Sequence, residues 1–317
     1  MSSGLGIILS GGLRQSLLRR QMGVPIGALP VTQNSSLVGM WIRRMLQSPK
    51  INSIVVVTSD GADNEMLSQA VHQESLEEYV HVVVEPAGHR GPAGVLRDIA
   101  LGLDHDFYVV GEITSLPPNS LDAILVELGS DSTVMTIGMS DNRRPIGVYG
   151  FTRHSLEAIP DLGFFDVKEQ LIPALIDRGG TVLSKIMIPK QLRLTTLPEW
   201  LEAIQVLHEH GGPKVRVPEH VRVEGASLIE DGVTLHPGVS ILSSVVMSGA
   251  VIESGAVIAR SVIGPGVQVR KGFRIIDGIL AGQVSKITDK HRIAPSAQGS
   301  GRLGNQQSTV TVQSDHV

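Results

Sequence analysis

The chain has 317 residues, 42% of them hydrophobic and 18% charged, a composition typical of a globular protein with room for one large domain and a smaller one. The formal net charge of −4 argues against nucleic acid or an anionic membrane as a partner, because such partners require a surplus of clustered Lys and Arg. Since the sequence contains no cysteine, disulfides, thiolate metal sites and Cys nucleophiles are excluded.

The first residues carry no basic segment followed by a long apolar run, so we expect neither a signal peptide nor a membrane span, and a cytoplasmic location. Short β-branched runs then alternate with helical segments over residues 5–210, which predicts a mainly parallel sheet covered by helices. The predicted elements are strands at 6–9, 54–57, 80–84 and 107–110 and helices at 64–73 and 93–103.

From Pro213 onward the apolar residues recur every six positions instead, and Gly occupies most of the turns between them. After a slip of register near residues 260–261, the pattern resumes at Ile263. This periodicity predicts a parallel β-helix of three-sided coils, whereas a β-sandwich would need period-two alternation and longer strands. The two registers are Val223, Ile229, Leu235, Ile241, Met247 and Val233, Val239, Val245, Val251, Val257.

We expect the valines of the second register to be buried in the β-helix, and about eight hexapeptides to make fewer than three full coils. Beyond residue 285 the sequence becomes polar, and we expect this tail to be disordered.

The strand at 6–9 runs directly into a glycine pair, Gly11-Gly12, followed later by Pro25-Ile26-Gly27-Ala28-Leu29-Pro30-Val31. This opening resembles that of the NDP-sugar pyrophosphorylases, A-G-G-x-G-T-R-L and then P-K-P-L-L-P-V. Glycines after a buried strand let the backbone approach a triphosphate and offer N–H groups to its oxygens. A glycine pair also suits any tight strand-to-helix turn.

Three further segments are similar to the same family, in the same order along the chain. Residues 85–96 resemble its G-T-A-G-A-L segment, in which small residues let a nucleobase lie against a helix; a plain helix start with Pro in its first turn is the alternative. Residues 146–151 with 163–173 resemble its G-I-Y-x-F and F-F-D-x-K-x-x-L-I-P segments, and 196–203 its T-P-E-D-Y helix.

The resemblance implies a Rossmann-like nucleotidyltransferase domain, of the glycosyltransferase-A-like type, over residues 1–212. It also implies a left-handed β-helix over residues 213–284, followed by the tail at 285–317. The residues that it implies for nucleotide binding are Gly11, Gly12, Arg14, Gly91, Ala93 and Gly94.

The positions at which the family performs chemistry are substituted in this chain. Nucleotidyl transfer depends on positive charge and Mg²⁺ around the phosphates. The family's Arg and Lys align with Ser16 and Ile26, its third glycine with Arg14, and its two metal-binding Asp with Glu112 and Arg193. The section that holds the sugar phosphate is also missing, since residues 133–138 lead through 141–145 straight to 147. We therefore expect no catalytic residues of the family type.

Other residues keep a catalytic interpretation open. Glu112 would still bind Mg²⁺ through oxygen, and Arg14, Arg19 and Arg20 would reach phosphates from new positions unless they form a solvated helix face. For Asp60 and Asp63, a helix cap is a better explanation than a metal.

Three functions follow. The first is a non-catalytic relative that binds a nucleotide or nucleotide sugar and regulates or scaffolds an active enzyme, with homo- or hetero-oligomers formed through the β-helix. The second is an active, Mg²⁺-dependent nucleotidyltransferase with relocated residues; apart from this Mg²⁺, no cofactor is implied. The third is a trimeric acyltransferase of the β-helix type, for which His236, placed in a turn, would be the base.

Overall fold

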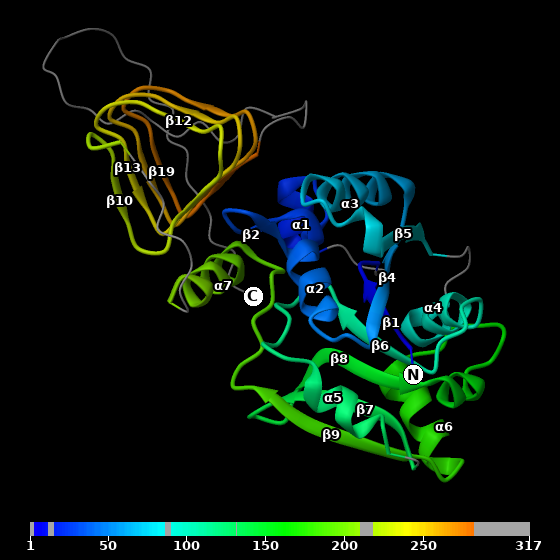
Figure 1. Cartoon of the computed structure of the whole chain (residues 1–317). Coiled ribbons are helices and arrows are strands. Elements are labelled where there is room, and N and C mark those ends of the chain that lie inside the picture. The colour runs from blue at the N-terminus through cyan, green and yellow to red at the C-terminus, as the bar shows by residue number, and fades with distance from the viewer. Residues whose placement is uncertain (1–2, 12–15, 86–89, 131, 210–217, 282–317) are drawn as a thin grey trace, which may run out of the picture. The chain divides into compact units, whose positions relative to one another are not determined.

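The computed structural model describes residues 3–11, 16–85, 90–130, 132–209 and 218–281 (Figure 1). The chain separates into two compact units, one made of residues up to Arg20 together with Val24–Glu199, the other of Gln21–Gly23 and the residues from Trp200 on. The predicted boundary at 212 lies outside the described residues and stays a prediction. Within the described ranges, no helix is both long and apolar enough to cross a membrane.

The first unit is built on a seven-stranded mixed sheet in the order β5-β4-β1-β6-β8-β7-β9. The first four strands are mutually parallel, β8 runs antiparallel to both β6 and β7, and β9 is parallel to β7. The predicted strands are thus confirmed, with extended ends. Their bounds are β1 (Gly4–Leu9), β4 (Ile51–Thr58), β5 (Val80–Val84), β6 (Phe107–Glu112), β7 (Thr133–Ser140), β8 (Pro145–Thr152) and β9 (Thr181–Ile188).

Helices cover both faces of this sheet. On one face Gly6 and Gly111 leave room for Met45 and Trp41 of α2, and Gly150 leaves room for α5. On the other face the apolar side chains of β1, β4 and β6 pack with those of α4 and α6 in one core. The helices of the chain are α1 (Leu17–Met22), α2 (Leu37–Leu46), α3 (Gly61–Gln73), α4 (Gly91–Ala100), α5 (Asp122–Glu127), α6 (Ile172–Asp177) and α7 (Leu197–Glu209), and most of α7 belongs to the second unit.

Shorter elements complete the unit. The strands β7 and β8 form a hairpin whose turn has Arg143 at φ 58°, so the direct link predicted from the sequence is confirmed. The remaining elements are β2 (Pro30–Thr32), β3 (Ser35–Ser36), the 3₁₀ helices η1 (Ile26–Ala28), η2 (Glu77–Tyr79) and η3 (Arg153–Ala158), and the π-helical turn η4 (Val167–Leu171).

The strand order reverses between β1 and β6. The chain adds β4 and β5 on one side of β1 and then returns to place β6 on its other side. Leu9, the last residue of β1, pairs with Val57 on one side and with Glu112 on the other, so the carboxyl ends of the three strands are level. In open α/β sheets, ligands bind in the crevice at such a switch point.

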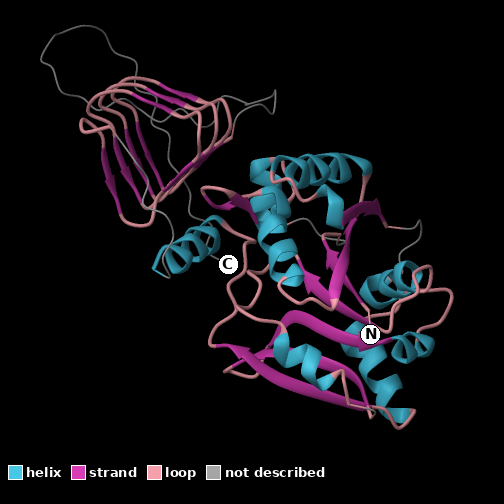
Figure 2. Cartoon of the chain, viewed as in Figure 1, coloured by secondary structure: helices cyan, strands magenta, loops and turns pink. Residues whose placement is uncertain are grey.

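The second unit contains a parallel β-helix, as the period of six predicted. Figure 2 shows its short strands on three sides of the coil with turns at the corners. One side is β10 (Arg222–Glu224), β13 (Ser240–Leu242), β16 (Val257–Ala259) and β19 (Arg274–Ile276). The others are β11 (Leu228–Ile229), β14 (Val245–Val246), β17 (Val262–Ile263) and β20 (Ile279–Leu280), and β12 (Thr234–Leu235), β15 (Val251–Ile252) and β18 (Gln268–Val269).

Two details of the sequence prediction are wrong. The strands β10–β20 make three full coils and most of a fourth, more than the predicted number. The one-residue shift of register also comes earlier than the expected position near residues 260–261. It is already present where Ile229 pairs with Val246, and Val246 in turn pairs with Ile263. Of the five valines expected to be buried, Val239 and Val245 are buried, whereas the other three are only partly so. A one-residue shift turns every following side chain to the opposite face, which is why the extrapolated register fails.

The shifted corner of the coil is held by buried serines. The backbone N–H of Ser244 donates to Oγ of Ser227 at 3.2 Å, and that of Ser261 donates to Oγ of Ser244 at 3.1 Å. The hydroxyls of Ser244 and Ser261 in turn donate to backbone carbonyls at 2.7 Å. This ladder satisfies polar groups inside the coil that would otherwise be costly to bury.

Candidate functional site

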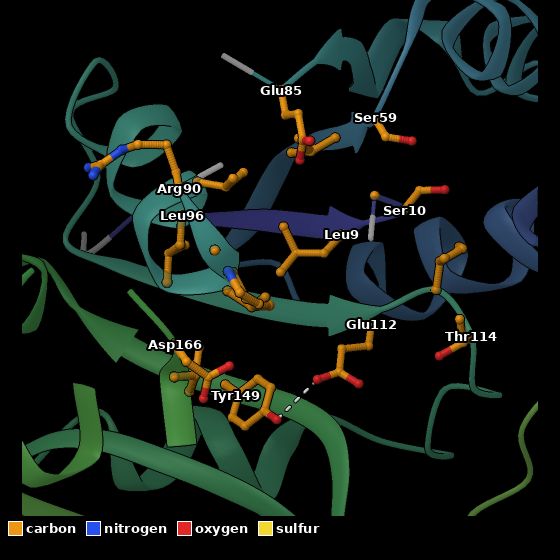
Figure 3. A pocket seen from close by; sticks show the side chains of 18 of the residues that line it. Leu9, Ser10, Ser59, Glu85, Arg90, Leu96, Glu112, Thr114, Tyr149 and Asp166 are labelled. Atoms are coloured by element: carbon orange, nitrogen blue, oxygen red, sulfur yellow. Dashed lines mark hydrogen bonds between the residues drawn. The ribbon is translucent and has the colours of Figure 1, made fainter. Parts of the chain in front are cut away.

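A cavity of about 630 Å³ lies at the carboxyl ends of β1 and β6, in the crevice of the switch point (Figure 3). Leu9, Ser10 and Gly11 line it from the end of β1, and Glu112 and Thr114 from the end of β6. Much of its remaining wall is apolar and comes from α4 and β8. The fold therefore builds a binding-sized cavity in the place where a doubly wound sheet offers one.

Glu112 is fixed within this cavity by two neighbours. The hydroxyl of Tyr149 in β8 donates a hydrogen bond to Oε1 of Glu112 at 3.1 Å (Figure 3). Gly147, at φ 76°, lies so close that a Cβ there would stand 2.8 Å from Oε2 of Glu112. Burial and the adjacent Glu112 carboxylate raise the pKa of Tyr149, so the phenol stays protonated and donates.

Arg90 lines the cavity, yet its guanidinium is committed elsewhere. It forms a two-pronged ion pair with Asp98, at 2.8 Å and 3.0 Å, and donates to the carbonyls of Pro160 and Gly163 at 2.9 Å and 2.7 Å. The hydrogen bonds to Asp98 raise the pKa of Arg90. Figure 3 shows the group pointing away from Tyr149 and Glu112. Arg90 thus holds the segment around 160–163 and is unavailable to a ligand.

The backbone N–H groups at the start of α4 are also engaged within the protein. The N–H groups of Ala93 and Gly94 donate to the carbonyl of Phe165 at 3.1 Å and 3.4 Å, so they are occupied by the chain itself. A Cβ on Gly91, at φ 72°, would stand 2.7 Å from that same oxygen, and a Cβ on Gly94 would stand 2.9 Å from Cβ of Arg90. The small residues here serve the packing of α4.

The structure places only some of the expected nucleotide-binding residues at the cavity. Gly11 and Gly91 line it, whereas Ala93 and Gly94 do not, and Ala93 is buried in the core that α4 forms with the sheet. Gly12 and Arg14 lie outside the described residues. On α4, the cavity is bordered by Gly91, Pro92, Val95 and Leu96. Nucleotide binding at this helix stays a prediction.

A second cavity of about 430 Å³ adjoins the first, and both are lined by Ser10, Gly11, Ser59, Ile113 and Thr114. It brings together Ser16, Ile26 and Arg193, three of the four positions that the sequence analysis aligned with catalytic residues of the family. The fourth, Glu112, lines the first cavity. Their role in any chemistry stays a prediction.

Several of these side chains have local structural roles. Ser16 accepts a hydrogen bond from the N–H of Arg19 at 3.1 Å and so caps α1. Asp60 caps α3 by accepting from the N–H of Asp63 at 2.8 Å, which confirms the predicted helix cap. The buried Asp63 pairs with Arg19, while Arg20 is exposed.

Arg193 is placed by the backbone beside the end of β6. The N–H of Leu194 donates to the carbonyl of Thr114 at 2.8 Å, and that of Leu116 donates to Leu192 at 3.0 Å, which pairs the two segments. The indole of Trp41 donates to the carbonyl of Ser115 at 2.8 Å. The Arg193 side chain is exposed in the second cavity.

Four polar residues that line the first cavity had no role in the sequence analysis. These are Glu85, Tyr149, Asp166 and Lys168. Tyr149, Asp166 and Lys168 lie inside segments that matched the family pattern, so their position in those motifs was an available signal. Glu85 directly follows β5 and begins the 85–96 segment that also resembles the family, so it had the same kind of signal.

Metal binding by Glu112 stays a prediction. Among the residues that the structure describes, no group of three or more His, Cys, Asp or Glu side chains could hold a metal ion. Mg²⁺ is usually held by one or two carboxylates together with phosphate oxygens. Here Glu112 is engaged with Tyr149, and the other expected metal position carries the cation of Arg193. We derive no step through a metal.

Comparison with known families finds a match in the C-terminal part of the chain. Residues 209–297 match the model of a family described as GMPPB C-terminal domain. The match covers the β-helix, supports the resemblance to NDP-sugar pyrophosphorylases and indicates a sugar-1-phosphate nucleotidyltransferase-like protein. Among curated proteins, no match to the chain is found.

Proposed function

We propose that this nucleotidyltransferase-like protein binds a nucleotide or nucleotide sugar in the crevice between β1 and β6 without catalysing nucleotidyl transfer, and that it regulates or scaffolds an active enzyme. In this proposal residues 1–212 form the binding domain and 213–284 a left-handed β-helix that mediates oligomerisation. The tail at 285–317 lies outside the described residues, and its disorder stays a prediction.

The observation that carries the proposal is a crevice at the switch point with Ser16, Ile26 and Arg193 gathered on one side of it. Gly11, two residues after the end of β1, lines both cavities, and the cavities together are large enough for a nucleotide-sized ligand. Yet Ser16 caps a helix, Ile26 is buried and Arg193 places a cation beside the end of β6. A transfer reaction needs charge stabilisation by groups aimed at the phosphates, and each replacement removes one of them.

The residues that remain are suited to recognition. Carboxylates such as Glu112 and Asp166 accept hydrogen bonds from hydroxyl or amino groups of a ligand, and Val95, Leu96 and Phe164 offer apolar surface to a ring. Tyr149 keeps Glu112 in one orientation, which favours selective binding over adaptable binding.

Two measurements test the proposal. A thermal-shift panel of NTPs and NDP-sugars, each with Mg²⁺ and with EDTA, should reveal ligands that raise the unfolding temperature, because binding to the folded state stabilises it. An assay of pyrophosphate release with the same NTPs and sugar 1-phosphates should stay at the no-enzyme blank. Steady turnover above the blank would support the active alternative, and the absence of any stabilising nucleotide would contradict the proposal.

A further inference from the structure

The two adjoining cavities differ in charge. Three carboxylates line the first cavity, and its only cation beside the committed Arg90, among the described residues, is Lys168. Those carboxylates belong to Glu85, Glu112 and Asp166. An anionic group placed among them would be repelled, since like charges in a partly desolvated pocket destabilise each other.

The second cavity carries the opposite charge. Its charged lining residues in the described chain are Arg19, Asp63 and Arg193. Arg19 and Asp63 form an ion pair and cancel, and their side chains are 14% and 7% exposed. Arg193 forms no ion pair with any residue that the structure describes, so one positive charge is left uncompensated in this cavity.

The surroundings of Arg193 suit an oxyanion. Hydroxyl groups of Ser10, Ser59 and Thr114 line the same cavity and would supply neutral hydrogen bonds. The backbone pairing of residues 192–194 with 114–116 holds the start of the Arg193 side chain in place. A guanidinium presents a planar fork of donors that matches phosphate oxygens in a bidentate manner.

We infer that Arg193 anchors a phosphate or diphosphate group in the second cavity, while the uncharged, hydroxyl-bearing part of the same ligand occupies the first. The identification of that ligand as a nucleotide or nucleotide sugar rests on the proposed function. The guanidinium supplies the positive charge that a phosphate would otherwise obtain from a divalent cation. Binding is therefore independent of Mg²⁺.

The test uses calorimetry on the full chain in EDTA and again in Mg²⁺. The ligands are inorganic pyrophosphate and a panel of nucleoside diphosphates and NDP-sugars. Wild type is compared with Arg193→Gln, Arg193→Lys and the matched control Arg144→Gln, an exposed arginine in the turn between β7 and β8 that lines neither cavity. Thermal unfolding of each variant checks that the fold is retained.

We expect pyrophosphate and diphosphate ligands to bind wild type equally with and without Mg²⁺. Arg193→Gln should weaken both at least about tenfold, Arg193→Lys should recover part of the loss, and Arg144→Gln should bind as wild type does. Equal binding by Arg193→Gln and wild type, or binding that requires Mg²⁺, would overturn the inference.

The outcomes separate this inference from the proposed function. If nucleotides bind but Arg193→Gln has no effect, the inference fails and the proposed function stands. If pyrophosphate binds through Arg193 and no nucleotide binds, the anion site stands and the proposed function fails. If wild type binds neither, both are wrong.

Discussion

The Tyr149 hydroxyl donates a hydrogen bond to Glu112 across 3.1 Å and so joins the middle of β8 to the carboxyl end of β6. The two strands are antiparallel neighbours, and the pair closes the floor of the first cavity. Tyr149 is only 2% exposed, and burial together with the Glu112 carboxylate raises its pKa. An ionised phenol next to this carboxylate would be repelled, so the folded protein favours the protonated phenol.

The first prediction concerns that pair. Because the pKa of Tyr149 is higher in the folded than in the unfolded state, its contribution to stability is complete below the unfolded pKa of about 10 and is lost as the pH rises above it. Tyr149→Phe should lower the free energy of unfolding by about 1 kcal/mol at pH 8, through loss of the hydrogen bond. Its stability should then decline less steeply than that of wild type above pH ~10.

Urea unfolding at several pH values measures both effects. Tyr79→Phe is the control, since Tyr79 is 40% exposed. Identical pH profiles of Tyr149→Phe and wild type would show that the phenol is not coupled to folding.

A second prediction separates backbone strain from steric overlap at the start of α4. Gly91 and Gly163 both have positive φ, 72° and 88°, so alanine at either site is strained by about 1–2 kcal/mol. A Cβ at Gly91 would also stand 2.7 Å from the Phe165 carbonyl, whereas nothing lies within 4 Å of one at Gly163. Gly91→Ala should therefore cost about 1–3 kcal/mol more than Gly163→Ala. If both variants lose the same free energy of unfolding in chemical denaturation, the segment around Phe165 moves away from the added Cβ without measurable cost.

Much of the fold followed from the sequence, because strand and coil periodicities are local patterns. The β-branched runs predicted β1, β4, β5 and β6, and the period of six predicted the β-helix. The register failed because the corner that contains Ser243 and Ser244 is one residue shorter than the corner of the coil before it. This shorter corner leaves the six-residue spacing of the apolar side chains intact before and after it. Its only trace in the sequence is a one-residue offset between the two stretches.

The site was harder to predict, because its details depend on partners distant in sequence. The motif placed Gly91, Ala93 and Gly94 together, but no local pattern says that the Phe165 carbonyl occupies the N–H groups of α4. Likewise, the pairing of Arg19 with Asp63 leaves Arg193 as the uncompensated charge of the second cavity within the described chain, and this balance appears only in three dimensions.

The third prediction concerns the serine ladder of the β-helix. Ser244 is fully buried, and its hydroxyl both donates to the Leu242 carbonyl at 2.7 Å and accepts from the N–H of Ser261 at 3.1 Å. Ser244→Ala removes the acceptor of the Ser261 N–H inside the coil and should cost about 1–3 kcal/mol, although the Leu242 carbonyl still accepts from the N–H of Arg260 at 2.9 Å. Ser248→Ala, in an exposed turn of the same coil, should change stability by less than about 0.5 kcal/mol. If both variants unfold at the same denaturant concentration, the ladder does not stabilise the coil.

The fourth prediction concerns the start of α7, where Glu199 forms a capping box. One of its carboxylate oxygens accepts from the N–H groups of Thr195 and Thr196, each at 3.0 Å, while the Thr196 hydroxyl accepts from the N–H of Glu199 at 3.4 Å. Burial on its own raises the pKa of Glu199, but the hydrogen bonds from Thr195 and Thr196 outweigh it, and the pKa is lowered.

A lowered folded pKa means that the unfolded chain takes up the proton first as the solution is acidified. The stability contributed by Glu199 is therefore complete above the unfolded pKa of about 4.3 and is lost as the pH falls through the lower, folded value. Glu199→Gln keeps a hydrogen-bond acceptor but cannot ionise. It should be less stable than wild type by about 1 kcal/mol at pH 7, and this difference should shrink as the pH falls below 4. Glu65→Gln, at an exposed position of α3, provides the matched loss of one charge. Thermal unfolding between pH 3 and pH 7 measures the three profiles, and a Glu199→Gln deficit that stays constant over this range would show that the carboxylate charge plays no part in capping α7.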